Sequence, residues 1–132
     1  MEAEIERILS ESRTVAVVGI SDKPDRPSHI VARYLKERGY RIIPVNPLLS
    51  EVLGEKVYKS LSEIPGKVDL VDVFRKSVNV LPVAEEAIRV GARFFWMQEG
   101  VTSEAARELL ARAGIPVVMD RCMMKELAKR GG

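Results

Sequence analysis

Basic side chains recur just after the apolar runs 14–20, 69–74 and 115–119 of this sequence. The five members of this group are Lys23, Arg26, Arg75, Lys76 and Arg121. If the apolar runs are parallel strands, their carboxyl ends meet at one edge of a sheet and the cations converge there. Gly19 permits a sharp turn at the same edge, and a helix that follows it offers unpaired N–H groups and the positive end of its dipole. The sequence therefore predicts an anion site suited to phosphate groups.

Strands and helices must alternate to build that edge. Apolar, largely β-branched runs predict strands over 14–20, 41–46, 69–74, 94–97 and 115–119, with a short strand near 56–58. Helical periodicity predicts helices over 2–12, 28–38, 79–90, 103–113 and 123–129, with Ser28 and Ser103 as N-caps. This alternation predicts one α/β domain over residues 1–132: a doubly wound parallel sheet of about five strands, of the Rossmann type.

Composition narrows the functional classes. The 132 residues are 46% hydrophobic and 30% charged, enough for a core, and a net charge of +2 argues against nucleic acid as a partner. A single cysteine excludes an internal disulfide and a cysteine-based zinc cluster, and we expect no metal and a reducing, cytoplasmic setting. No apolar run approaches the roughly 20 residues of a membrane span, and the acidic beginning is unlike a signal peptide. Few amide side chains among many opposite charges suggest heat adaptation.

A nicotinamide dinucleotide is the first ligand to weigh for such a domain. Its fingerprint G-x-G-x-x-G is reduced here to the first glycine, Gly19. Dinucleotide-binding domains also place an acidic residue near the end of the second strand to hold the ribose, and Asn46 stands in that region. These two losses count against NAD, although an NAD(P)-dependent oxidoreductase stays as an alternative.

Six segments, in order, carry a family resemblance: VAVVGIS at 15–21, PVNP at 44–47, VLG-K-Y at 52–58, VDVF at 71–74, W-x-Q-x-G at 96–100 and DRC at 120–122. Over nearly its whole length the chain resembles the stand-alone coenzyme A-binding domain proteins. These are similar to the N-terminal domain of the succinyl-CoA synthetase α subunit and of ADP-forming acyl-CoA synthetases. The resemblance implies a Rossmann-like fold that binds CoA in an extended pose across the strand ends.

The resemblance also implies a role for each matching position. The expected contacts are Gly19, Ile20 and Ser21 to the phosphates, Lys23 and Arg26 as countercharges, Val45, Asn46 and Pro47 beside the adenosine, Phe74, Arg75 and Lys76 along the middle of the groove, and Met97, Gln98 and Glu99 toward the pantetheine. Two features depart from the synthetase pattern. Only one glycine of its phosphate loop is present, and Leu48 and Leu49 stand where it carries a basic residue.

Other reactive residues have structural interpretations. We expect His29 to support the helix start, and Cys122 to be a small buried residue, with a mixed disulfide to CoA as the alternative. Asp72 interrupts a buried strand and must be hydrogen-bonded or paired. The run 125–130 is expected to be a solvated helix face, and the apolar run 48–53 leaves open a homo-oligomeric structural protein.

No nucleophile stands beside a general base in this sequence. We therefore expect a non-catalytic module that binds CoA or acyl-CoA. The enzymatic alternatives are the oxidoreductase and a CoA-ligase subunit that needs a partner chain.

Overall fold

A five-stranded parallel sheet forms the centre of the molecule in the computed structural model, which describes all residues 1–132. The strands lie in the order β2-β1-β5-β6-β7, and every neighbouring pair is parallel. Their bounds are β1 Thr14–Val18, β2 Arg41–Val45, β5 Leu70–Val73, β6 Phe94–Met97 and β7 Val117–Val118. This order confirms the predicted doubly wound α/β architecture and places the reversal of strand order between β1 and β5.

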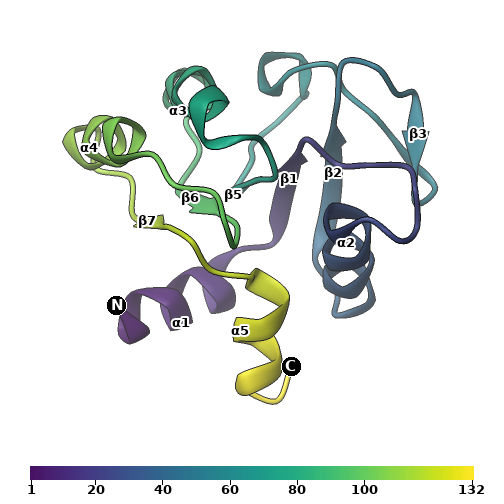
Figure 1. The fold of residues 1–132 in the computed structure, drawn as a ribbon, viewed down its shortest axis with the longest axis horizontal. Coiled ribbons are helices and arrows are strands. Elements are labelled where there is room, and N and C mark those ends of the chain that lie inside the picture. The colour runs from purple at the N-terminus through teal and green to yellow at the C-terminus, as the bar shows by residue number, and fades with distance from the viewer.

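Helices cover both faces of the sheet (Figure 1). Helices α1, α2 and α5 pack on one face, and α3 and α4 pack on the other. Their bounds are α1 Glu2–Glu11, α2 Pro27–Glu37, α3 Val80–Arg89, α4 Glu104–Arg112 and α5 Met123–Lys129. A small antiparallel hairpin of β3 (Glu51–Val52) and β4 (Glu55–Lys56) and two short 3₁₀ turns, η1 (Leu61–Glu63) and η2 (Ser77–Asn79), complete the chain. None of the helices has the length and apolar composition that crossing a bilayer requires.

The two cores follow from the alternation of side chains along each strand. In β1, Val15 and Val17 join the core beneath α1, α2 and α5, whereas Ala16 and Val18 join the core beneath α3 and α4. All four side chains are buried, which explains why the run reads as continuously apolar rather than alternating. The sheet is thus held from both sides, and its strand ends form a rigid edge.

At the amino ends of the strands, Asp69 ties β1 to β5. One of its carboxylate oxygens accepts hydrogen bonds from the backbone N–H groups of Arg13 (2.8 Å) and Thr14 (3.1 Å). The Thr14 hydroxyl in turn accepts from the Asp69 N–H at 2.9 Å. Asp69 therefore has a structural role, and the carboxyl ends of the strands are left to carry the site.

The bounds of some elements differ from those expected. The last strand covers only Val117–Val118, because Pro116 has no N–H to donate and Asp120 adopts a positive φ of 62°. The short strand expected near 56–58 is present as β4 at Glu55–Lys56, in a hairpin with β3, and Tyr58 makes a single parallel bridge to Val45. Helix α2 starts with Pro27 after an N-cap at Arg26 rather than at Ser28.

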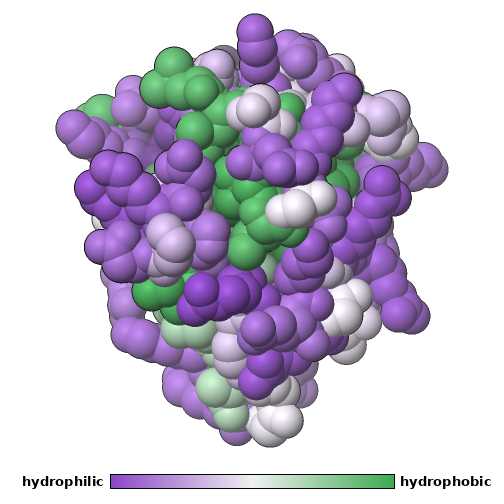
Figure 2. Space-filling view, turned by 90° about the vertical axis from the view of Figure 1, so that its right-hand side faces the viewer, coloured by the Kyte–Doolittle hydropathy of each residue, from purple (hydrophilic) through white to green (hydrophobic).

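The apolar run 48–53 packs mostly inward. Val52 is buried, Leu49 and Leu53 pack partly against the core, and Leu48 is 88% exposed. Figure 2 views the molecule from the side of β2, α2 and the β3–β4 hairpin and shows apolar surface at the centre of this face, framed by hydrophilic side chains.

Candidate functional site

A cavity of about 490 Å³ opens at the carboxyl edge, the edge formed by the carboxyl ends of the five strands. We call it the first cavity. It brings together eight of the positions expected from the sequence: Gly19, Ser21, Lys23, Arg26, Phe74, Arg75, Lys76 and Glu99. Three lining residues were not anticipated, namely Pro27, Ser28 and Val101. The cavity lies where the strand order reverses, which is the usual ligand position in open α/β sheets.

Gly19 brings the ends of β1 and β5 into close approach. Its φ is +89°, and a Cβ at this position would lie 2.8 Å from the carbonyl oxygen of Phe74. The Gly19 N–H donates to Val45 at 2.9 Å, so the turn is also tied to the end of β2. Any larger residue would both strain the backbone and push β1 away from β5, which explains the glycine at this turn.

The loop between β1 and α2 is held by its own side chains. Ser28 accepts the Ser21 N–H at 2.9 Å, and the Ser21 hydroxyl accepts the Lys23 N–H at 3.0 Å. The Nδ1 atom of His29, a residue only 7% exposed, lies 3.0 Å from the Ser21 carbonyl oxygen. His29 therefore supports this loop, as expected, and Ser28 serves the loop instead of capping the helix.

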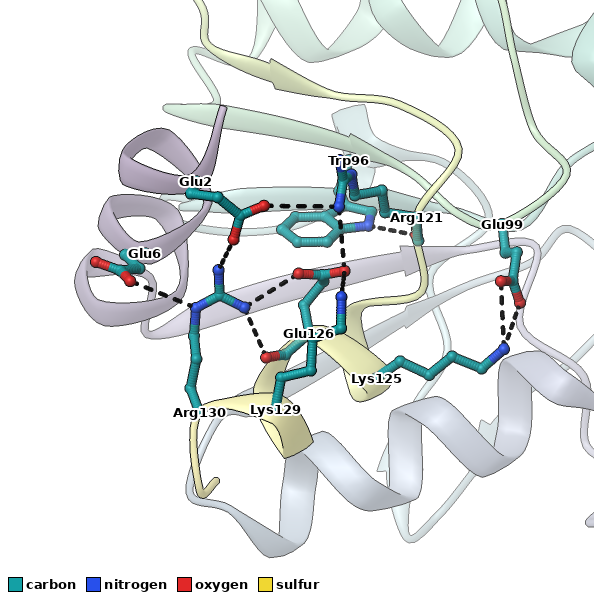
Figure 3. Close-up of polar contacts among 9 residues, drawn as sticks. All are labelled: Glu2, Glu6, Trp96, Glu99, Arg121, Lys125, Glu126, Lys129 and Arg130. Carbon is teal, nitrogen blue, oxygen red and sulfur yellow. Dashed lines mark hydrogen bonds and ion pairs between the residues drawn. The ribbon is translucent and has the colours of Figure 1, made fainter.

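The basic residues of the first cavity have no partner within the protein. The side chains of Lys23, Arg26, Arg75 and Lys76 make no hydrogen bond or ion pair, and Nε of Arg75 is buried without an acceptor. The one acidic lining residue, Glu99, is 2.9 Å from Nζ of Lys125 (Figure 3). The cavity is thus positively charged, and a buried guanidinium nitrogen still lacks an acceptor there.

Arg121, expected as a fifth cation of this edge, is instead part of an ion-pair network (Figure 3). Its guanidinium lies 3.5 Å from Glu126 and 3.7 Å from Glu2, and its carbonyl oxygen accepts the Trp96 indole N–H at 2.8 Å. Arg130 joins the same two carboxylates, at 3.0 Å and 2.6 Å. These contacts fasten α5 to α1 rather than facing a ligand.

The helix face at 125–130 is exposed at Lys125, Ala128 and Lys129, as expected, but Glu126 is only 4% exposed. Burial by itself raises the pKa of Glu126, but hydrogen bonds from Arg130 and Lys129 outweigh it and hold the pKa below its ordinary value. Glu126 and Arg130 therefore belong to the interface between α5 and the N-terminal helix α1.

A second cavity, of about 420 Å³, adjoins the first through Arg75, which lines both. Its walls come from the ends of β1 and β2 and from α3: Val18, Val45, Lys59, Ser60, Arg75, Asn79, Pro82, Val83 and Glu86. Val45 is the one residue of the expected adenosine group that lines it. A ligand longer than either cavity could therefore extend from one to the other past Arg75.

The remaining expected contact residues line neither cavity. Ile20 and Met97 are fully buried, so neither residue is exposed to a ligand in this structure. The Asn46 amide donates to the Ile20 carbonyl (2.8 Å) and accepts the Leu48 N–H (2.8 Å), while Pro47 is exposed beside it. Gln98 is buried and donates to Asp72 at 2.6 Å. Their expected ligand contacts stay predictions.

Asp72 has the partner that its burial requires. One carboxyl oxygen accepts from Gln98, and the other has no partner. Burial raises the pKa of Asp72 to about 7, against the lowering effect of that hydrogen bond. Cys122 is likewise buried, in the core beneath α5, and free of any disulfide.

The sequence and the fold of this chain are similar to those of known proteins. Residues 13–128 match the family described as the CoA binding domain. The chain belongs to this family. It is 48% identical over 122 residues to the uncharacterized protein YneT of Bacillus subtilis, covering 92% of this chain and 90% of that protein. The structure of a hypothetical protein from Pyrococcus horikoshii OT3 superposes with a TM-score of 0.96 at 39% identity, covering 100% of this chain and 93% of that one.

Part of the chain is also similar to a ligase subunit. Over 59 residues it is 48% identical to the acetate–CoA ligase (ADP-forming) II subunit alpha of Pyrococcus furiosus. The match covers 44% of this chain and 13% of that subunit.

Proposed function

We propose that this chain binds coenzyme A, or an acyl-CoA thioester, at its carboxyl edge without catalysing a reaction. The observation that carries the proposal is the set of four partnerless cations around the first cavity of a CoA-binding-domain fold. CoA carries a diphosphate and a 3′-phosphate, roughly four negative charges in all. Four cations match that charge, and the buried Arg75 nitrogen gains an acceptor when a phosphate enters.

An oxidoreductase that uses NAD fits this edge less well, whereas NADP has about the same phosphate charge as CoA and is disfavoured only by the residue at the end of β2. Asn46 stands at the end of β2 and supplies no carboxylate for a ribose diol, and its amide is already oriented by hydrogen bonds to Ile20 and Leu48. The diphosphate of NAD carries about two negative charges, which would leave part of the cation cluster without countercharge. CoA is therefore the better match for the same Rossmann-like scaffold.

Binding without catalysis agrees with the positions of the reactive groups. The His29 ring is engaged with the Ser21 carbonyl, and Cys122 is buried in the core. Asp72 is buried in the sheet and lines neither cavity. None of these groups is paired as a nucleophile with a base at the cavity wall.

A second candidate function is that of a ligase subunit acting with a partner chain. The similarity to an ADP-forming acetate–CoA ligase subunit supports it. Co-purification of the tagged chain with a larger, ATP-binding subunit, together with ADP formation in the presence of CoA and acetate, would favour this function over a free-standing CoA-binding module.

Calorimetric titration with CoA at several salt concentrations tests the main proposal. Arg26→Ala and Arg75→Ala should each weaken binding by about 1 to 3 kcal/mol, because charge-assisted contacts to phosphate are lost. Binding by the wild-type chain should also weaken as salt is added. The matched control is Arg41→Ala, which removes an exposed arginine from the opposite end of β2 and should leave affinity unchanged. Unchanged affinity in both cavity variants, or tighter binding of NAD than of CoA, would refute the proposal.

A further inference from the structure

The second cavity has the chemistry of a site for a phosphorylated nucleoside. Val18, Val45, Pro82 and Val83 supply an apolar lining, and Lys59 and Arg75 supply positive charge. A purine ring is flat and largely apolar on its faces, whereas a phosphate needs cations, so the two kinds of lining suit the two parts of one ligand. Because Arg75 also lines the first cavity, a ligand held there by its diphosphate can extend directly into the second cavity.

Lys59 is held near the end of β2 by the backbone next to it. The Tyr58 N–H donates to Pro44 at 3.0 Å, and the Asn46 N–H donates to Tyr58 at 2.9 Å. The lysine that follows is therefore anchored at its Cα, although its ammonium group is exposed. The Lys59 side chain makes no hydrogen bond or ion pair with the protein, so its charge is available at the cavity mouth.

The one acidic residue of the second cavity, Glu86, forms no ion pair with Lys59 or Arg75. The carboxylate of Glu86 accepts the backbone N–H groups of Leu61 and Ser62, each at 3.2 Å, and the Ser62 hydroxyl at 2.8 Å. Three donors hold it against the η1 turn. Lys59 and Arg75 are thus the charged groups of this cavity that remain available to a ligand.

We propose that the second cavity holds the adenosine of CoA and that Lys59, together with Arg75, binds its 3′-phosphate. This inference rests on the proposed CoA binding and deepens it, because Lys59 becomes the residue that distinguishes CoA from nucleotides without that phosphate. Arg75 lines both cavities, so the cations of the first cavity and Lys59 of the second together face the diphosphate and the 3′-phosphate of CoA.

The test compares CoA with 3′-dephospho-CoA, which differ only in this phosphate. Calorimetric titrations of both ligands are run on the wild-type chain, Lys59→Ala and Lys59→Arg. We expect Lys59→Ala to weaken CoA binding by roughly threefold to tenfold and dephospho-CoA binding by less than about twofold, and Lys59→Arg to restore most of the CoA affinity. The control, Lys67→Ala, removes an equally exposed lysine beside the amino ends of β1 and β5 and should change neither affinity.

The outcomes separate this inference from the proposed function. If the wild-type chain binds neither ligand, CoA binding itself is refuted. If it binds both equally well, or if Lys59→Ala weakens both to the same degree or neither, CoA binding stands and the role of Lys59 is refuted. A loss confined to CoA supports the inference, because only the contact to the 3′-phosphate differs between the two titrations.

Discussion

The carboxyl group of Asp72 should make the stability of this fold depend on pH in an unusual direction. Asp72 lies in β5 between Val17 of β1 and Trp96 of β6, and its side chain is fully buried. Burial raises its pKa from 3.8 to about 7. Replacing it by asparagine keeps the shape and an acceptor for Gln98 but removes the titration.

The linkage between proton binding and folding gives the direction and the size of the contribution of Asp72 to the free energy of folding. Between about pH 4 and pH 7 the unfolded chain releases the Asp72 proton while the folded chain keeps it, so this group makes folding less favourable as pH rises. A shift of about three pKa units corresponds to roughly 4 kcal/mol at the upper end of the interval, since each unit is about 1.4 kcal/mol. Below about pH 4 the group contributes nothing, because it is protonated in both states.

Urea denaturation of the wild-type chain and Asp72→Asn from pH 4 to pH 8 measures this term. The asparagine adds a pH-independent penalty of about 1 to 3 kcal/mol, because its amide N–H groups replace an oxygen that has no partner in this structure. Relative to wild type, the variant should therefore gain up to about 4 kcal/mol across the interval. Parallel stability profiles would refute the reasoning, as would a carbon-13 NMR titration in which the Asp72 carboxyl is fully ionised at pH 5.

Two further changes test the support of the site. Gly19→Ala should lower stability by about 1 to 3 kcal/mol and weaken CoA binding, because its methyl group meets the Phe74 carbonyl. Gly114→Ala, at φ +76° with open space around it, controls for the backbone conformation alone, and equal losses in both variants would contradict the close-approach argument. Glu126→Gln should cost about 2 kcal/mol near neutral pH, because it removes the buried carboxylate that Arg121, Lys129 and Arg130 share. That cost should shrink as pH falls below 4.5, the ordinary pKa of a glutamate carboxyl, and the wild-type carboxyl takes up a proton, so a pH-independent cost in denaturant unfolding would contradict it.

The sheet could be predicted because its strands are buried on both faces. Continuous β-branched runs such as 14–18, separated by amphipathic helices, leave few alternatives to a parallel sheet. The ends of the elements were harder, since they depend on hydrogen bonds made across the fold. Ser28 has the chemistry of an N-cap but accepts the Ser21 N–H instead, so α2 begins earlier than the sequence pattern indicates.

The cations of the first cavity could be predicted from their positions relative to the strands. The position of Arg75 directly after a strand determines that it lies at the carboxyl edge, whatever its contacts. The partners that a side chain at this edge finds in space could not be predicted from its position in the sequence. Arg121 also follows a strand, yet its guanidinium forms ion pairs with Glu2, from the far end of the chain, and with Glu126 of α5. Gln98 turns inward because Asp72 of the adjacent strand needs a donor, and that pairing is visible only once β5 and β6 are side by side.

Net charge is a poor guide to this edge, since +2 overall conceals a local excess of cations. The acidic residues lining the two cavities are both held by protein donors: Glu99 by Lys125 and Glu86 by the η1 turn. The basic residues lining the same cavities have no protein partners. Glu99 is thus paired with a cation and Glu86 is hydrogen-bonded to the η1 turn, while the cations of the cavities stay unpaired, so the edge can attract a multiply phosphorylated ligand on a nearly neutral chain. At physiological salt the screening length is about 8 Å, so these cations act mainly on a ligand that has entered the cavities they line.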